Sequence, residues 1–273
     1  MARVTVREAP PRISLSPVND EQIEEQLAQI GARFVRDKTA TKLSELARQL
    51  DRGHCHLKLP HAGARKLSPV ELVRRCQAGV LVVAKIYKCD ECPRWHVNTA
   101  SGFMLTESGA FATSYHVADA PQLEAMLILT GDGRVAPVKE VLAANEAADV
   151  AVLRAEGAGF TALPLGAAAP AGAMVRVISH PDRRYFTLSE GIVSRYFAFR
   201  EGTDTVTLMA ITADFAKGSS GAPVLDEHGA VVGMVNNTFS SYYSTDHGRK
   251  DDLQMVFKNC TPSEYLHKLL GDR

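Results

Sequence analysis

Residues 218–235 read GSSGAPVLDEHGAVVGMV, and this stretch decides the fold. Two serines lie among glycines, and an apolar run, a polar turn and a second apolar run follow. Short apolar runs on both sides of a turn that contains Asp and Gly predict two antiparallel strands. The stretch therefore indicates β-structure, and it raises the question whether Ser220 belongs to a loose loop or to a turn that presents its hydroxyl.

Strand-like runs of the same kind continue through the chain from residue 79. They are short, rich in β-branched residues and separated by Gly, Pro or Asp turns, a spacing typical of an antiparallel barrel or sandwich. The runs cover 80–87, two strands within 102–117, and 149–155, 173–180, 190–197, 205–213, 221–226 and 230–237. Because no strand–helix–strand alternation appears, the sequence predicts an all-β domain over residues 79–273.

Residues 1–78 show a helical pattern and are predicted to form an N-terminal extension. Residues 1–17 are Pro-rich and expected to be extended, whereas Asn19 can cap a helix and residues 68–71 (SPVE) form a capping box. Apolar residues recur at helical spacing: Ile23, Leu27, Ile30 and Phe34, then Leu43, Leu46 and Leu50. We expect these helices to pack on the β domain; a segment that covers a cleft and an oligomerisation arm stay open as alternatives.

A last helix is predicted at the C-terminus, where Thr261 can act as the cap and Glu264 can complete a capping box. Pro262 then takes the first helical position, which proline favours. The chain would end soon after this helix, with no PDZ-like extension expected.

Composition and charge exclude several classes of protein. The 273 residues have a formal net charge of zero, so no basic field for nucleic acid is expected. No apolar run approaches the roughly 18–20 residues that span a bilayer. The N-terminus shows no apolar core of a secretory signal. The expected class is a globular protein with a sizeable core.

Three residues offer the chemistry of a nucleophilic serine. A serine hydroxyl needs a base to take its proton, and a histidine base needs a carboxylate to fix its tautomer. His116 is expected at the end of a strand, Asp149 at the start of another, and Ser220 in the Gly-rich turn. Each of the three residues could instead have a purely structural role in a turn or at a strand end, but their joint presence favours a catalytic triad.

The segments around these residues carry a family resemblance. TSYHVADA (113–120), AADVAVLR (147–154) and GSSGAPV (218–224) resemble the three catalytic blocks of chymotrypsin-like serine proteases, in their bacterial trypsin-like and HtrA-type branch. The resemblance covers about residues 79–260. It implies two six-stranded Greek-key barrels with the site in the cleft between them, a polypeptide substrate, and neither cofactor nor metal.

The resemblance also implies a role for each site residue. His116 would be the general base, Asp149 its orienting carboxylate and Ser220 the nucleophile, with the N–H groups of Gly218 and Ser220 forming the oxyanion hole. Two positions depart from the family pattern. Ser219 replaces an aspartate that pairs with a new N-terminus in digestive proteases. Ala222 replaces a glycine, and its methyl would crowd the turn if φ were positive there.

The resemblance suggests a substrate preference as well. Asp214 lies six residues before Ser220, where trypsin-like enzymes keep the carboxylate of the primary pocket, which implies cleavage after Arg or Lys. A structural turn carboxylate is the alternative for Asp214. Residues 236–238 (Asn236, Asn237 and Thr238) are expected to bind an extended substrate backbone. Gln254 and Met255 are expected to line the far wall of the pocket.

Cys89 and Cys92 form a C-x2-C pair with His96 four residues further on. We expect a local disulfide here, which favours an oxidising compartment and hence a secreted or periplasmic protein. A pair of reduced thiols is one alternative, and a zinc site completed by His96 and the HCH segment at 54–56 is another. A thioredoxin-like redox motif is not expected, because the required βαβ context is missing.

The function predicted first is therefore a serine endopeptidase. A catalytically silent relative that only binds extended peptides stays open, because Ser219 and Ala222 depart from the pattern and the chain carries a helical N-terminal arm. The G-x-S-x-G elbow of α/β hydrolases half-resembles residues 218–222, but that elbow requires a helix after the serine, so this third class is excluded.

Overall fold

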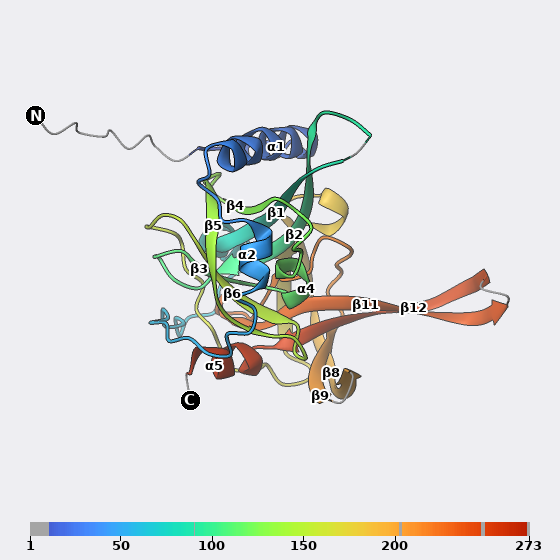
Figure 1. Ribbon diagram of the computed structural model, residues 1–273. Helices are drawn as coiled ribbons and strands as arrows, with labels where there is room; N and C mark the ends of the chain where they lie inside the picture. The colour runs from blue at the N-terminus through green and yellow to red at the C-terminus, as the bar shows by residue number, and fades with distance from the viewer. Residues whose placement is uncertain (1–10, 90, 202–203, 247–248, 272–273) are drawn as a thin grey trace, which may run out of the picture.

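The computed structural model describes residues 11–89, 91–201, 204–246 and 249–271, and the fold is all-β (Figure 1). Two closed, antiparallel, six-stranded barrels confirm the predicted architecture. The first consists of β1 (Val80–Lys88), β2 (Trp95–Met104), β3 (Ala110–Thr113), β4 (Ala125–Thr130), β5 (Val135–Asn145) and β6 (Val150–Ala155). The second consists of β7 (Met174–Ser179), β8 (Thr187–Glu201), β9 (Asp204–Ile211), β10 (Pro223–Leu225), β11 (Val231–Asp246) and β12 (Arg249–Pro262).

Short helices surround the barrels and largely follow the sequence predictions. They are α1 (Asp20–Arg36), α2 (Leu43–Ala47), α3 (Pro69–Cys76), α4 (Tyr115–Ala118) and α5 (Glu264–Leu270), with 3₁₀ turns at Gln77–Gly79 and Pro181–Arg183. Asn19 caps α1 by accepting a hydrogen bond from the Gln22 N–H, and both bonds of the Ser68–Glu71 capping box are present. None of the described helices combines the length and apolarity that a membrane span requires.

The helix α1 lies on the outer face of the first barrel, as expected for the N-terminal stripe (Figure 1). Ile23 and Leu27 are buried there against the outward side chains of β1, which explains why β1 is apolar on both faces. The helix approaches closely at Gly31, where a Cβ atom would lie 2.4 Å from the Ile86 side chain. Residues 1–10 of the predicted extended segment lie outside the described residues, but Ile13 is buried and its N–H donates to the Gly133 carbonyl.

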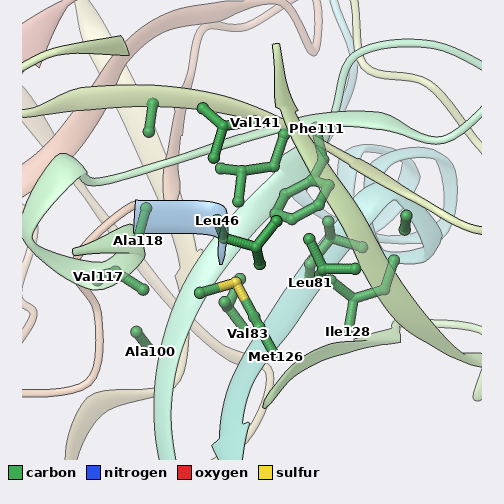
Figure 2. Close-up of a cluster of buried hydrophobic side chains, with 14 of the residues drawn as sticks. Leu46, Leu81, Val83, Ala100, Phe111, Val117, Ala118, Met126, Ile128 and Val141 are labelled. Atoms are coloured by element: carbon green, nitrogen blue, oxygen red, sulfur yellow. The ribbon is translucent and has the colours of Figure 1, made fainter. Parts of the chain in front are cut away.

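The interior of the first barrel is a hydrophobic cluster that also anchors α2 and α4 (Figure 2). Leu46 of α2 and Val117 and Ala118 of α4 join side chains such as Phe111 and Met126 from the strands. Fully burying a side chain the size of leucine or phenylalanine stabilises a fold by about 1.5–3 kcal/mol. The cluster therefore fixes α4, which carries His116, to the barrel.

The structure corrects three secondary-structure predictions. The strands β4, β5 and β12 were missed. His116 lies in the helical turn α4 rather than at the end of a strand. Thr261 and Pro262 belong to β12 rather than to the last helix, because they pair with β11 and the Thr261 hydroxyl donates to the Ala148 carbonyl. Ser263 takes the cap position of α5, without a side-chain capping bond.

The predicted disulfide is also wrong. All five cysteines are free, and the Cys89 and Cys92 sulfur atoms lie 3.3 Å apart, beyond the roughly 2.05 Å of an S–S bond. His96 is close to both sulfurs, so three side chains that could ligate a metal ion gather where the disulfide was expected. The HCH segment takes no part in it: the Cys55 N–H donates to the Leu269 carbonyl at the C-terminal helix.

Candidate functional site

His116 and Asp149 lie together on the first barrel. The His116 Nδ1 atom lies 2.9 Å and 3.0 Å from the two carboxylate oxygens of Asp149, and the His116 backbone N–H donates to the same carboxylate at 3.0 Å. The His116 side chain is 55% exposed, whereas that of Asp149 is 18% exposed. The carboxylate therefore fixes the imidazole through Nδ1 and leaves Nε2 available to another group.

Asp149 occupies a tight turn between β5 and β6. Its φ is +53°, a left-handed conformation that is uncommon outside glycine but tolerated by aspartate, and its N–H donates to the Glu146 carbonyl. A residue held in such a conformation requires support from its surroundings and is frequent at functional sites. The turn directs the carboxylate toward α4, where both hydrogen-bond donors of His116 meet it.

Ser220 lies on the second barrel, in the loop before β10, and lines a pocket of about 280 Å³ together with His116. Its hydroxyl donates to the Asn236 carbonyl at 3.3 Å. The described atoms show no hydrogen bond between Ser220 and His116, a bond that is often long in substrate-free enzymes and tightens when substrate binds. Glycines with positive φ flank the serine, Gly218 at +96° and Gly221 at +88°, so the opening stretch folds as a tight turn.

Ser101 of β2 holds this turn and was missed by the sequence reasoning. Its backbone N–H donates to the Ser220 carbonyl and its hydroxyl to the Gly218 carbonyl, both at 2.9 Å. Gly221 packs so closely that a Cβ atom there would lie 2.3 Å from the Ser101 carbonyl oxygen. Ser101 thereby ties the serine turn of one barrel to a strand of the other. The available signal was a serine within a buried strand, because a buried hydroxyl requires a partner.

The two departures from the family pattern are accommodated locally. The Ser219 hydroxyl is buried and donates to the Ser179 hydroxyl at 3.0 Å, and the Ser219 N–H donates to the Ala216 carbonyl. Positive φ falls on Gly221 rather than on Ala222, so the expected steric strain at Ala222 does not arise. Thus the turn is stabilised by hydroxyl and backbone hydrogen bonds in place of an ion pair.

The buried residue His180 packs against the same turn. The carbonyl of His180 lies where a side chain on Gly218 would have to go, 2.5 Å from a Cβ atom, so only glycine fits there. Burial lowers the His180 pKa to about 4. The neutral ring donates from Nε2 to the Leu81 carbonyl and accepts the Phe186 N–H at Nδ1. His180 therefore joins the second barrel to β1 of the first.

The predicted substrate-binding residues separate into two groups. Asn236, Asn237 and Thr238 line the Ser220 pocket, together with Phe215, Ala216, Lys217 and Val235. The Asp214 carboxylate does not line it: its side chain is 91% exposed and lies 3.4 Å from the Lys258 ammonium.

The predicted far wall is wrong. Met255 pairs with Ser241 on the long β11–β12 hairpin, and neither Gln254 nor Met255 lines the Ser220 pocket. Instead, Phe215 and Val235 contribute its apolar surface. The missed strand β12 accounts for this error, because pairing with β11 carries residues 254 and 255 away from the pocket along the hairpin.

Comparisons with known proteins agree with the two-barrel fold. Residues 100–234, which include all three triad candidates, match the trypsin-like peptidase domain family. This match, together with the two-barrel fold, supports a chymotrypsin-like serine protease. A protein of Hahella chejuensis (strain KCTC 2396), described as a probable periplasmic serine endoprotease, DegP-like, is 28% identical over 151 residues. That alignment covers 54% of this chain and 31% of the relative, so the chain spans about a third of the relative's length.

Solved structures show the same fold. Two structures of the HtrA-type protease AlgW with a decapeptide superpose on this chain with TM-scores of 0.57 and 0.60. Their sequence identities are 18% and 16%, and they cover 72% and 76% of this chain and 64% and 69% of their own. At this identity the likeness concerns the fold.

Proposed function

We propose that this chain is a serine endopeptidase that hydrolyses polypeptides through an acyl-enzyme, with His116, Asp149 and Ser220 as its triad. The observation that carries the proposal is the bond of His116 Nδ1 to Asp149, with the histidine facing a pocket that it shares with Ser220. The family supports the assignment, because the matched residues 100–234 include all three side chains.

The proposed reaction proceeds in two balanced halves. His116 Nε2 takes the proton of the Ser220 hydroxyl as the oxygen attacks the peptide carbonyl, and the N–H groups of Gly218 and Ser220 stabilise the oxyanion. The imidazolium then gives its proton to the leaving amine, and the acyl-enzyme remains. Water then attacks the acyl carbonyl as His116 takes its proton, and the imidazolium returns that proton to the Ser220 oxygen as the bond to the acyl group breaks, which releases the carboxylic acid and free Ser220.

For the primary pocket we propose a preference for apolar side chains of modest size. Phe215, Ala216 and Val235 line the pocket, and Lys217 would repel a substrate cation. The preference for Arg or Lys that the sequence predicts depends on Asp214, whose carboxylate is exposed and close to Lys258. A peptide library separates the two preferences: cleavage after Arg or Lys that is lost in Asp214→Asn would support the Arg/Lys preference instead.

We also propose that residues 1–78 form an extension of the protease domain that covers the remainder, residues 79–273. Its helices share buried clusters with the first barrel, and the residues that line the Ser220 pocket include none from this extension. We also propose a periplasmic location. This proposal rests only on the relative that is named as periplasmic, because the disulfide that would have supported it is not formed.

The test is hydrolysis of an unfolded protein such as casein by the wild type and by Ser220→Ala and His116→Ala. Each substitution should lower kcat by about 10⁴-fold or more. Ser244→Ala and His61→Ala, at exposed positions outside the site, are matched controls and should retain full activity. A folded wild type that binds casein but does not cleave it would favour the silent peptide-binding module.

A further inference from the structure

A second cluster of ligating side chains lies at the end of the β1–β2 hairpin. The Cys89 and Cys92 sulfur atoms are 3.3 Å apart, and the His96 Nε2 atom lies 3.3 Å from the first and 3.0 Å from the second. All three side chains are half-buried. None of them lines the Ser220 pocket, so the cluster plays no part in the proposed proteolysis.

The strand register explains how these residues meet. β1 and β2 pair so that Tyr87 faces His96, and their rings stack with centroids 5.5 Å apart. Cys89 follows Tyr87 by two positions, which places its side chain on the same face of the hairpin as the imidazole. The turn then returns Cys92 to both of them. The pairing of β1 with β2 therefore brings the side chains of Cys89, Cys92 and His96 together.

The geometry fits a metal ion better than a disulfide. In a tetrahedral zinc site, with Zn–S near 2.3 Å and Zn–N near 2.0–2.1 Å, neighbouring ligand atoms lie about 3.5–3.8 Å apart. The three separations here need to grow by about half an ångström or less to accept the ion. A disulfide, in contrast, would leave the imidazole without a role. Two thiolates and one imidazole are a soft donor set that favours zinc.

We propose that Cys89, Cys92 and His96 bind one zinc ion that clips the end of the β1–β2 hairpin. Binding releases the two thiol protons, and the sulfurs and Nε2 become ligands. Within the described part of the chain these are the three ligating groups in reach, so a water molecule completes the tetrahedron. The ion has an entry path, because His96 also lines a groove between the hairpin and α1.

The proposal is tested on the full chain, produced without a metal-binding tag, stripped with a chelator, incubated with Zn²⁺ and desalted. The wild type should retain about one zinc ion per chain. The double variant Cys89→Ser/Cys92→Ser should retain less than about a tenth of that amount. Cys55→Ser removes a half-buried cysteine outside the cluster and should bind zinc as the wild type does. Equal zinc contents in the wild type and the double variant would overturn the proposal.

A second measurement needs only the wild type and so does not depend on the folding of a variant. Zn²⁺ should protect Cys89 and Cys92 from alkylation and leave the reactivity of Cys55 unchanged, as read by peptide mass spectrometry. Co²⁺ as a spectroscopic probe should give the thiolate charge-transfer and visible bands of a tetrahedral site. Alkylation that is unaffected by Zn²⁺, or a Cys89–Cys92 disulfide that forms in its presence, would overturn the zinc site whether or not the chain proves to be a protease.

Discussion

The two barrels contribute differently to the site. The first is covered: α1 lies on the outer face of β1, and α2 and α4 extend its core (Figures 1 and 2). The long β11–β12 hairpin projects from the second barrel (Figure 1). On this hairpin the side chain of Phe239 is 62% exposed and that of Tyr243 is 80% exposed. The first barrel holds His116 and Asp149, and the second barrel carries Ser220 and most of its pocket. The comparison teaches that α4, which carries His116, is fixed by a packed core, whereas the serine turn is held by hydrogen bonds.

The largest expected effect concerns the pair on the covered barrel. Asp149→Asn keeps the shape of the side chain but removes the charge that orients His116, so kcat should fall by about 10⁴-fold. Casein hydrolysis and a thermal melt measure activity and folding together. Asp119→Asn, on the same helical turn but without a bond to His116, is the control and should lose less than about tenfold. Equal losses in both variants would contradict the assigned role of Asp149.

The serine turn of the second barrel is tested next. Gly218→Ala forces a side chain into a left-handed position against the His180 carbonyl, so the oxyanion donors should be displaced and kcat should fall by about 10²–10³-fold. Gly172→Ala is the matched control, because Gly172 has a φ of +87° and a Cβ atom there would meet no other atom within 4 Å. Steady-state kinetics of both variants separate backbone strain from loss of the oxyanion hole. Similar kinetics in the two would contradict the proposed hole.

The helix α1, which covers the first barrel, should contribute more to the free energy of unfolding than the β11–β12 hairpin of the second barrel. Leu27→Ala leaves a cavity between α1 and β1 and should lower the free energy of unfolding by about 2–5 kcal/mol. Met255→Ala on the exposed hairpin should change it by less than about 0.5 kcal/mol. Urea unfolding measures both. If Leu27→Ala left the free energy of unfolding unchanged, α1 would not be part of the folded core.

The smallest effect comes from the histidine that joins the barrels. Because burial lowers the His180 pKa from 6.5 to about 4, the unfolded chain binds more protons between these values. Stability due to the neutral ring is therefore complete above pH 6.5 and is lost as pH falls toward 4. The free energy of unfolding should drop by about 2 kcal/mol between about pH 7 and about pH 5. His180→Gln should remove this part of the pH dependence. If the free energy of unfolding of the variant fell with pH as steeply as that of the wild type, the role given to His180 would be wrong.

Much of this arrangement could be predicted from the sequence, because the signals were local. Asn19 and the Ser68–Glu71 box specified helix starts through neighbouring backbone groups. The Gly-rich turn around Ser220 specified a conformation that only glycine adopts easily. The pairing of His116 with Asp149 was anticipated from the family resemblance, and the structure brings the two side chains together.

What escaped prediction depended on contacts between distant segments. Ser101 is an ordinary strand serine until the second barrel supplies Ser220 and Gly218 as its partners. The strand β12 was missed because its exposed outer half lacks a buried face, so its pattern resembles a loop. The expected Cys89–Cys92 disulfide failed because strand register, which the spacing of cysteines does not report, brings His96 close to both sulfurs.

The central claim is that His116 activates Ser220, and covalent labelling tests it most directly. A fluorophosphonate reacts only with a serine whose neighbours have activated it, so the wild type should carry one adduct, located on Ser220 by mass spectrometry. Labelling should vanish in Ser220→Ala and His116→Ala and persist in Ser244→Ala. A folded wild type that stays unlabelled, or an adduct that forms equally well in His116→Ala, would contradict the account.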